Sequence, residues 1–218
     1  MSRTSLLCLN LLAGLLLAGC ASQTIAPSQY SGFLADYSQL QPTTSASGAP
    51  ILRWISPDFR AQDYPEIYVE KPVFYPAPRP SEEVSQATLE QISAYLHEAI
   101  KRELAQRMRV VDTPTRDSLV LRSAITAVGS SAESLQFYEV IPVALVLAAA
   151  NTAAGTRDRD THIAIELEAL AARSSQPMVR VVRKGHGLQL ENDSARLTLD
   201  DIRPALDVWA TDARAFRP

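Results

Sequence analysis

Alternating side chains near residue 165 constrain the fold of this chain more than any other feature. Apolar residues recur there at every second position, at Ile163, Ile165, Leu167 and Ala169. The polar residues between them include His162, Glu166 and Glu168. A period of two predicts a β-strand with one packed face and one face in solvent. The turn residues 174–177 and the valine-rich run 178–184 then predict an antiparallel hairpin.

Two other segments have helical spacing. In residues 87–108 one side of the predicted helix carries Leu89, Ile92, Leu96, Ile100 and Leu104. A closing helix over 200–216 aligns Leu206, Trp209, Ala213 and Phe216. Extended runs near 67–75, 110–111 and 119–128 predict further strands. These elements predict an α/β fold, a two-layer sandwich with a mixed or antiparallel sheet and helices packed on one face.

The first twenty residues have the pattern of a bacterial lipoprotein leader. Arg3 precedes the apolar run 6–17, which is too short to span a bilayer comfortably. The small residues Ala18 and Gly19 then precede Cys20. We expect cleavage between Gly19 and Cys20, with lipidation of the Cys20 sulfur. An ordinary secretory signal with an incidental cysteine is the less favoured alternative. Two or three acyl chains, palmitate among them, would hold the protein on a membrane essentially permanently.

Charge and cysteine content fit that location. Loss of Arg3 with the leader lowers the basic count from 21 to 20 against 24 acidic residues, for a mature net charge of about −4. This balance gives no electrostatic basis for binding nucleic acid. Cys8 leaves with the leader and Cys20 takes lipid, so no disulfide is expected. Ala21 is not the aspartate that retains enteric lipoproteins at the inner membrane, which favours the outer membrane and its periplasmic face by resemblance.

The mature chain divides into a tether and a body. We expect a signal peptide over 1–19, a lipid-anchored tether and docking segment over 20–50, and a single α/β domain over 51–218. Within the tether, a short helix is predicted to dock through Tyr30, Phe33, Leu34 and Tyr37. Residues 41–50 have no periodicity and are predicted to form a loop.

No catalytic, metal or cofactor motif emerges from the sequence. His162, Glu166 and Glu168 form the best metal-like group, but a solvated strand face explains their pattern more simply. Gly185 and Gly187 are attributed to relief of backbone strain at a strand end rather than to a phosphate-binding turn. The serines lie outside any nucleophile elbow. We therefore expect a protein that is not an enzyme and has no cofactor.

The apolar segment 140–154 allows two interpretations. It is too short to span a membrane as an ordinary helix, so burial in the core is favoured. The alternative is an exposed surface that contacts another protein, a second copy of the chain or the bilayer. The candidate partner surface then consists of Val143, Leu145, Val146 and Leu147.

Several motifs resemble those of the DUF3313 family of bacterial lipoproteins. They are the runs 30–34, 36–38 and 64–69, the residues 110–112 after the long helix, and the closing Trp209. The resemblance covers nearly the whole mature chain. The family has no assigned activity, so the resemblance implies structural kinship and assigns no functional residue. The turn at 174–177 departs from the Thr-Gly-Glu type of turn that relatives often carry.

These observations predict a lipid-anchored periplasmic module that interacts with envelope proteins or associates with itself. The alternative is a lipoprotein that binds a small molecule or an envelope polymer. That alternative predicts a concave pocket lined around Trp54, Tyr68 or Tyr75.

Overall fold

Two long antiparallel strands, β7 (Arg159–Ala171) and β8 (Gln176–Leu190), form the middle of the sheet. They are joined by a tight turn in which Ser175 has a left-handed φ of 57°. The computed structural model describes residues 25–132, 159–191 and 195–218. The hairpin predicted from the alternating pattern is therefore confirmed, with its second strand beginning at Gln176.

In the described ranges the sheet has eight strands, mixed in direction. Its path is β1-β2-β8-β7-β6-β3-β5, and β4 pairs with β6 beside this path. The pairs β3–β5, β3–β6 and β4–β6 are parallel, whereas the others are antiparallel. The remaining strands are β1 (Gln41–Thr44), β2 (Pro50–Ile55), β3 (Glu66–Val69), β4 (Val73–Phe74), β5 (Arg109–Val111) and β6 (Ser118–Ala132).

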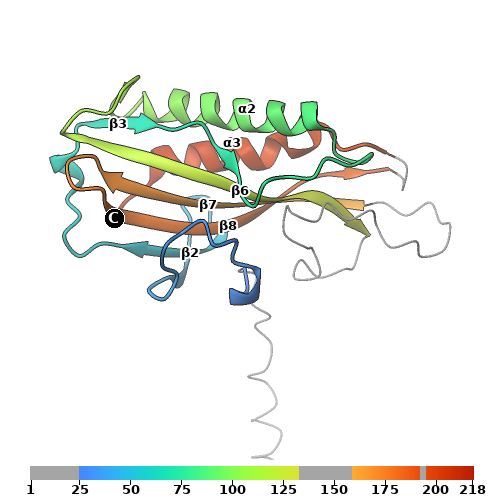
Figure 1. Ribbon diagram of the computed structural model, residues 1–218, viewed down its shortest axis with the longest axis horizontal. Coiled ribbons are helices and arrows are strands. Elements are labelled where there is room, and N and C mark those ends of the chain that lie inside the picture. Colours follow the sequence, from blue (N-terminus) through green and yellow to red (C-terminus); the bar gives the residue numbers. More distant parts are fainter. Residues whose placement is uncertain (1–24, 133–158, 192–194) are drawn as a thin grey trace, which may run out of the picture.

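Both long helices cover the same face of this sheet (Figure 1). Helix α2 (Gln86–Leu104) begins at Ser85, whose side chain accepts a hydrogen bond from the Thr88 N–H, and it buries its whole predicted apolar stripe. Helix α3 (Leu199–Ala215) begins at Thr198, whose N–H donates to the Asp201 carboxylate. The predicted two-layer α/β sandwich with helices on one face is confirmed.

The two faces of the sheet carry different clusters. On the face covered by α2 and α3, here called the helix side, the alternating residues of β7 join the main core. On the opposite face, the outer side, a smaller cluster joins residues 25–40 to the sheet. Its buried members include Ile25, Leu34, Leu40, Leu52, Ala164 and Val182.

Two predictions for residues 30–50 are wrong. Residues 25–40, the part called the docking segment from here on, contain a 3-10 turn at Pro27–Gln29 and no helix over Tyr30 to Tyr37. Gly32 has a left-handed φ of 88°, and the Tyr37 hydroxyl accepts hydrogen bonds from the Gly32 and Leu34 N–H groups. Side chains thus satisfy backbone donors that a helix would otherwise pair. The predicted loop after Leu40 begins instead with β1, an edge strand paired with β2.

The prediction that Gly185 and Gly187 relieve backbone strain at a strand end is wrong. They lie inside the strand rather than at its end, because helix α3 crosses directly over them. A Cβ at Gly187 would lie 1.9 Å from the Asp201 carbonyl oxygen, and one at Gly185 would lie 3.0 Å from the Ala205 Cβ. Glycine here permits close packing between strand and helix.

Within the described residues, no helix is long and apolar enough to cross a lipid bilayer. The division of the chain at residues 19 and 50 stays a prediction.

Candidate functional site

The site residues predicted from sequence fall outside the described part of the chain. This holds for Gly19 and Cys20, and also for Val143, Leu145, Val146 and Leu147. Their assigned roles in cleavage, lipidation and partner binding stay predictions. Any functional geometry must therefore come from the sheet, the two helices and the docking segment.

The polar face of β7 is buried, so the prediction that it meets solvent is wrong. His162, Glu166 and Glu168 are only 2%, 1% and 6% exposed. Burial lowers the pKa of His162 to about 4. Among the described residues no three potential ligands are grouped for a metal ion. The carboxylates instead hold other parts of the chain in place.

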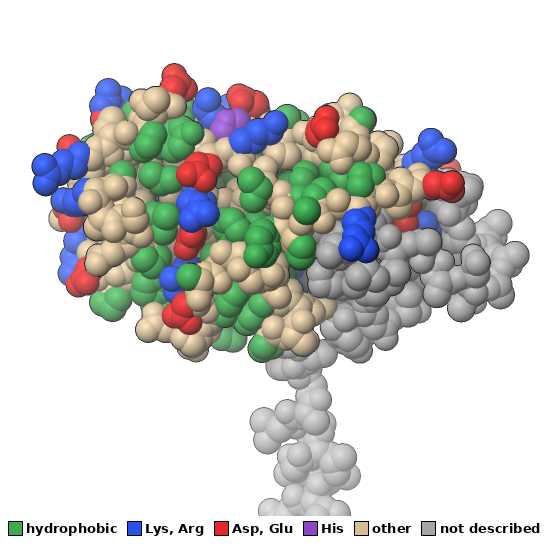
Figure 2. Space-filling model, viewed as in Figure 1, with side chains coloured by type: hydrophobic (Ala, Val, Ile, Leu, Met, Phe, Trp, Pro, Cys, Tyr) green, Lys and Arg blue, Asp and Glu red, His purple; other side chains and the backbone are tan. Residues whose placement is uncertain are grey.

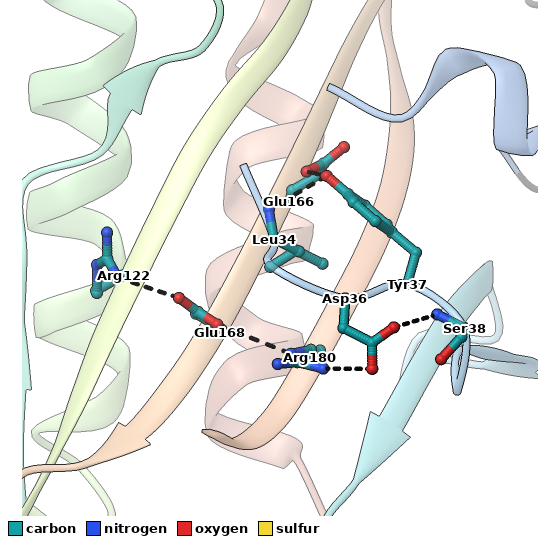
Figure 3. Close-up of polar contacts among 8 residues, drawn as sticks. All are labelled: Leu34, Asp36, Tyr37, Ser38, Arg122, Glu166, Glu168 and Arg180. Carbon is teal, nitrogen blue, oxygen red and sulfur yellow. Dashed lines mark hydrogen bonds and ion pairs between the residues drawn. The ribbon is translucent and has the colours of Figure 1, made fainter. Parts of the chain in front are cut away.

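Glu166 fixes the docking segment to the outer side (Figure 3). Its Oε1 accepts a hydrogen bond from the Ser31 N–H at 2.8 Å. Its Oε2 accepts from the Ser31 hydroxyl at 2.8 Å and from the Tyr37 hydroxyl at 2.5 Å. Burial, and then the Glu166 carboxylate, raises the pKa of Tyr37 to about 12. The Tyr37 hydroxyl therefore stays a donor at any physiological pH.

A row of alternating charges runs across the same side of the sheet (Figures 2 and 3). Arg122 lies between Glu70 and Glu168, at 3.5 and 3.2 Å. Arg180 lies between Glu168 and Asp36, at 3.8 and 3.4 Å. Hydrogen bonds from Ser38, and then the charge of Arg180, lower the pKa of Asp36. The row joins three strands to the docking segment by charge pairing.

The main cavity of the described chain does not lie around Trp54, Tyr68 or Tyr75, where the sequence predicted a pocket. Trp54 packs in the outer cluster, with the Arg180 guanidinium 5.3 Å from its ring centroid. Tyr75 is 42% exposed beside the docking segment, where its ring lies 6.0 Å from that of Phe33. Neither these two side chains nor Tyr68 lines the main cavity, which is described next.

The main cavity lies on the helix side, between the sheet and both helices. Its volume is about 560 Å³, and its wall includes Ile67, Leu96, Ile100, Leu119, Ile165 and Trp209. Exposed residues such as Gln62 and Arg107 also line it, so the space opens to solvent and reaches inward to the apolar core. Its size and lining match those of sites that bind small apolar molecules.

One buried ion pair lies in the cavity wall. Arg183 donates to Asp212 at 2.9 Å, and its guanidinium lies 5.3 Å from the Trp209 ring centroid. Asp212 also accepts hydrogen bonds from the Ser47 N–H and hydroxyl, at 2.7 and 2.9 Å. Burial lowers the pKa of Arg183, and Asp212 opposes that shift. The pair ties the β1–β2 turn to helix α3.

Arginine side chains mark the mouth of the cavity. Arg53, Arg107 and Arg217 line it, and Arg107 and Arg217 are exposed. All three contact Phe216, at the end of the molecule where the chain terminates (Figure 1). Sequence reasoning missed this site, although Arg183 gave a signal. It occupies an inward position of a valine-rich strand, where a charge needs a partner.

Comparisons with known proteins give similarity without a defined activity. A family model described as "Protein of unknown function (DUF3313)" matches residues 29–213. The chain is 44% identical over 217 residues to the uncharacterized lipoprotein YdcL of Escherichia coli K12, covering 99% of this chain and 98% of that relative.

Solved structures resemble the chain weakly. A neuraminyllactose-binding hemagglutinin homolog from Helicobacter pylori has a TM-score of 0.42 at 10% identity, covering 69% of this chain and 79% of its own. The PelC dodecamer from Paraburkholderia phytofirmans has a TM-score of 0.38 at 6% identity, covering 74% and 96%. We draw no functional conclusion from similarity at this level.

Proposed function

The chain belongs to the DUF3313 family of proteins of unknown function, and we propose that this member is a lipid-anchored envelope lipoprotein that binds a small apolar molecule. The cavity of about 560 Å³ between the sheet and helices carries this proposal. An apolar ligand would remove hydrocarbon from water and supply the packing contacts that the cavity wall lacks.

Binding, rather than catalysis, suits the polar groups of the wall. Arg183 donates a hydrogen bond to Asp212, and Asp212 also accepts two hydrogen bonds from Ser47. These contacts hold the β1–β2 turn and leave Asp212 poorly placed to take a proton from a ligand. We therefore propose a carrier or sensor of the ligand that leaves it chemically unchanged.

The tryptophans provide a direct test of ligand binding. The chain has two, Trp209 in the cavity wall and Trp54 on the outer side. In a chain beginning at Ala21, a neutral bromoalkane should quench Trp209 fluorescence in the Trp54→Phe variant. It should leave Trp54 fluorescence unchanged in the matched Trp209→Phe variant. Equal quenching of Trp209 and Trp54, or no quenching of Trp209, would contradict the proposal.

The membrane anchor is a separate part of the proposal. The leader pattern ending at Cys20, together with the lipoprotein description of the 44% identical relative, supports it. We propose attachment through acyl chains on Cys20 after cleavage behind Gly19, on the periplasmic face of the outer membrane. Mass spectrometry should find an acylated amino-terminal Cys20 in outer-membrane fractions. An uncut leader or an unmodified cysteine would contradict it.

Interaction with an envelope protein, or self-association, stays a prediction that concerns residues outside the described part. Leu145→Asp tests it. Loss of a partner or oligomer with unchanged folding would support an interaction surface, whereas loss of folding would support a core role.

A further inference from the structure

Three guanidinium groups converge on one residue at the mouth of the cavity. The Arg53 guanidinium lies 5.7 Å from the Phe216 ring centroid. Arg107 donates to the Phe216 carbonyl oxygen, and Arg217 donates to the same oxygen at 3.0 Å. Since the Phe216 ring packs 6.5 Å from that of Phe59, the cluster sits directly on the apolar lining.

Among the described residues, these three positive charges have only neutral partners. Within the described ranges, no carboxylate lies within 4.0 Å of Arg53, Arg107 or Arg217. By contrast, Arg183 and Arg214 are paired nearby with acidic side chains. Burial, and then the charge of Arg217, lowers the pKa of Arg107. In the described part of the chain, the mouth therefore holds three like charges, none of which forms an ion pair.

We propose that this mouth binds the anionic head group of a single-chain amphiphile, whose hydrocarbon tail occupies the cavity. The inference rests on the proposed function and adds the chemical class of the ligand. Each guanidinium has five N–H donors, and the carbonyl bonds to Phe216 and its neighbours use only some of them. Carboxylate and phosphate oxygens match the remaining donors in geometry and charge.

The position of the docking segment indicates that the tail belongs to a separate molecule. Ile25, where the described chain begins, is buried on the outer side with the docking segment. The cavity is on the helix side, so the sheet separates it from Ile25 and the rest of the outer cluster. A free fatty acid is the simplest molecule with the required chemistry, and an alkyl phosphate is the alternative source of the same charge.

The test uses the full chain in membranes and three photoreactive probes that differ only in their head groups. Palmitic acid, hexadecanol and hexadecyl phosphate each carry the same diazirine in the chain, and labelled peptides are identified by mass spectrometry. We expect palmitic acid, hexadecyl phosphate or both to label the cavity lining more strongly than hexadecanol. The stronger anionic probe identifies the head group.

Arginine variants show whether the mouth causes this preference. Combined Arg53→Gln, Arg107→Gln and Arg217→Gln should lower the ratio of acid to alcohol labelling on the order of tenfold. Arg217→Gln alone, at an exposed site, should lower it severalfold and serves if the triple variant does not fold. Arg79→Gln, an exposed arginine outside the cavity lining, should leave the ratio unchanged.

The outcomes separate this inference from the proposed function. Equal labelling of the cavity by all three probes, unaffected by the arginine variants, would overturn the anionic head group and leave apolar ligand binding intact. Labelling of the cavity by none of the probes would overturn both. If the arginine variants kept the preference for anionic probes, the proposal that these arginines bind the head group would be overturned.

Discussion

The two sides of the sheet each contain a buried carboxylate that holds a distant serine. On the outer side Glu166 accepts the N–H and hydroxyl of Ser31, and on the helix side Asp212 accepts the same two groups of Ser47. The third partner differs. Glu166 accepts from the neutral Tyr37 hydroxyl, whereas Asp212 is paired with the Arg183 guanidinium.

The two faces of the sheet are also covered in different ways. On the outer side, hydrogen bonds to Glu166 and the apolar contacts of the outer cluster hold the docking segment directly against the strands. On the helix side, large side chains hold α2 and α3 above the sheet and leave a cavity at one end. We infer that the outer side serves attachment, whereas the helix side retains room for a ligand.

The largest expected effect is the loss of Asp212. Asp212→Ala would leave the buried charge of Arg183 unpaired, and we expect it to lower the free energy of unfolding by about 3–5 kcal/mol. Glu166→Ala would leave only neutral donors without an acceptor, at a cost of about 1–3 kcal/mol. Urea unfolding of both variants measures the difference. Equal losses would show that the two carboxylates have equivalent roles.

We expect low pH to lower the stability of the fold through His162, which lies on the outer side. The folded protein keeps this imidazole neutral down to a pKa of about 4, whereas the unfolded chain takes up a proton near 6.5. The unfolded state thus binds more protons between these values, and stability should fall by about 3 kcal/mol as the pH drops from 6.5 to 4.

Urea unfolding across that pH range, compared with His162→Gln, checks this expectation. The carboxylates contribute equally to both proteins, so the difference between the two curves isolates the imidazole. Parallel curves would contradict the burial effect on His162.

A matched pair of alanines on β7 compares the packing of the two sides. Ala164 is buried in the outer cluster, and Ala169 lines the cavity. We expect Ala164→Leu to cost about 1–3 kcal/mol through overpacking. Ala169→Leu should cost less than about 1 kcal/mol because its added atoms enter open space. Thermal or urea unfolding measures both, and equal costs would show that the helix side is packed as tightly as the outer side.

The smallest effect concerns the docking segment alone. Tyr37→Phe removes the 2.5 Å hydrogen bond to Glu166 and should lower stability by about 1 kcal/mol. Limited proteolysis should also cut residues 25–40 faster. Tyr75→Phe, at an exposed tyrosine, is the control and should change neither measurement. Unchanged cleavage in Tyr37→Phe would show that Ser31 and the apolar contacts suffice to hold the segment.

Local periodicity explains which parts of the fold could be predicted. The stripe from Leu89 to Leu104 and the alternation from Ile163 to Ala169 reflect an apolar face that packs into the main core, and nearby residues in the sequence suffice to reveal that face. The conformation of the docking segment depends on Glu166, which is 135 positions from Ser31. No local pattern in residues 30–37 encodes that partner, so a helix was predicted.

The site was harder to predict than the fold for a related reason. The cavity arises from the distance at which α2 and α3 pack over the sheet, and side-chain periodicity does not specify that distance. Its mouth joins Arg53, Arg107 and Arg217 from three separate parts of the chain. Each of them alone reads as an ordinary surface arginine. Only Arg183, charged at an inward strand position, pointed to the helix side.

The burial of Ile25 limits how far the body can stand from a membrane. Only five peptide units separate it from Cys20, and a fully extended chain of that length spans at most about 18 Å. Once acylated, as we propose, the protein would diffuse in two dimensions within a thin layer above the leaflet. A lipid that escapes from that leaflet would then meet the protein at a high effective concentration.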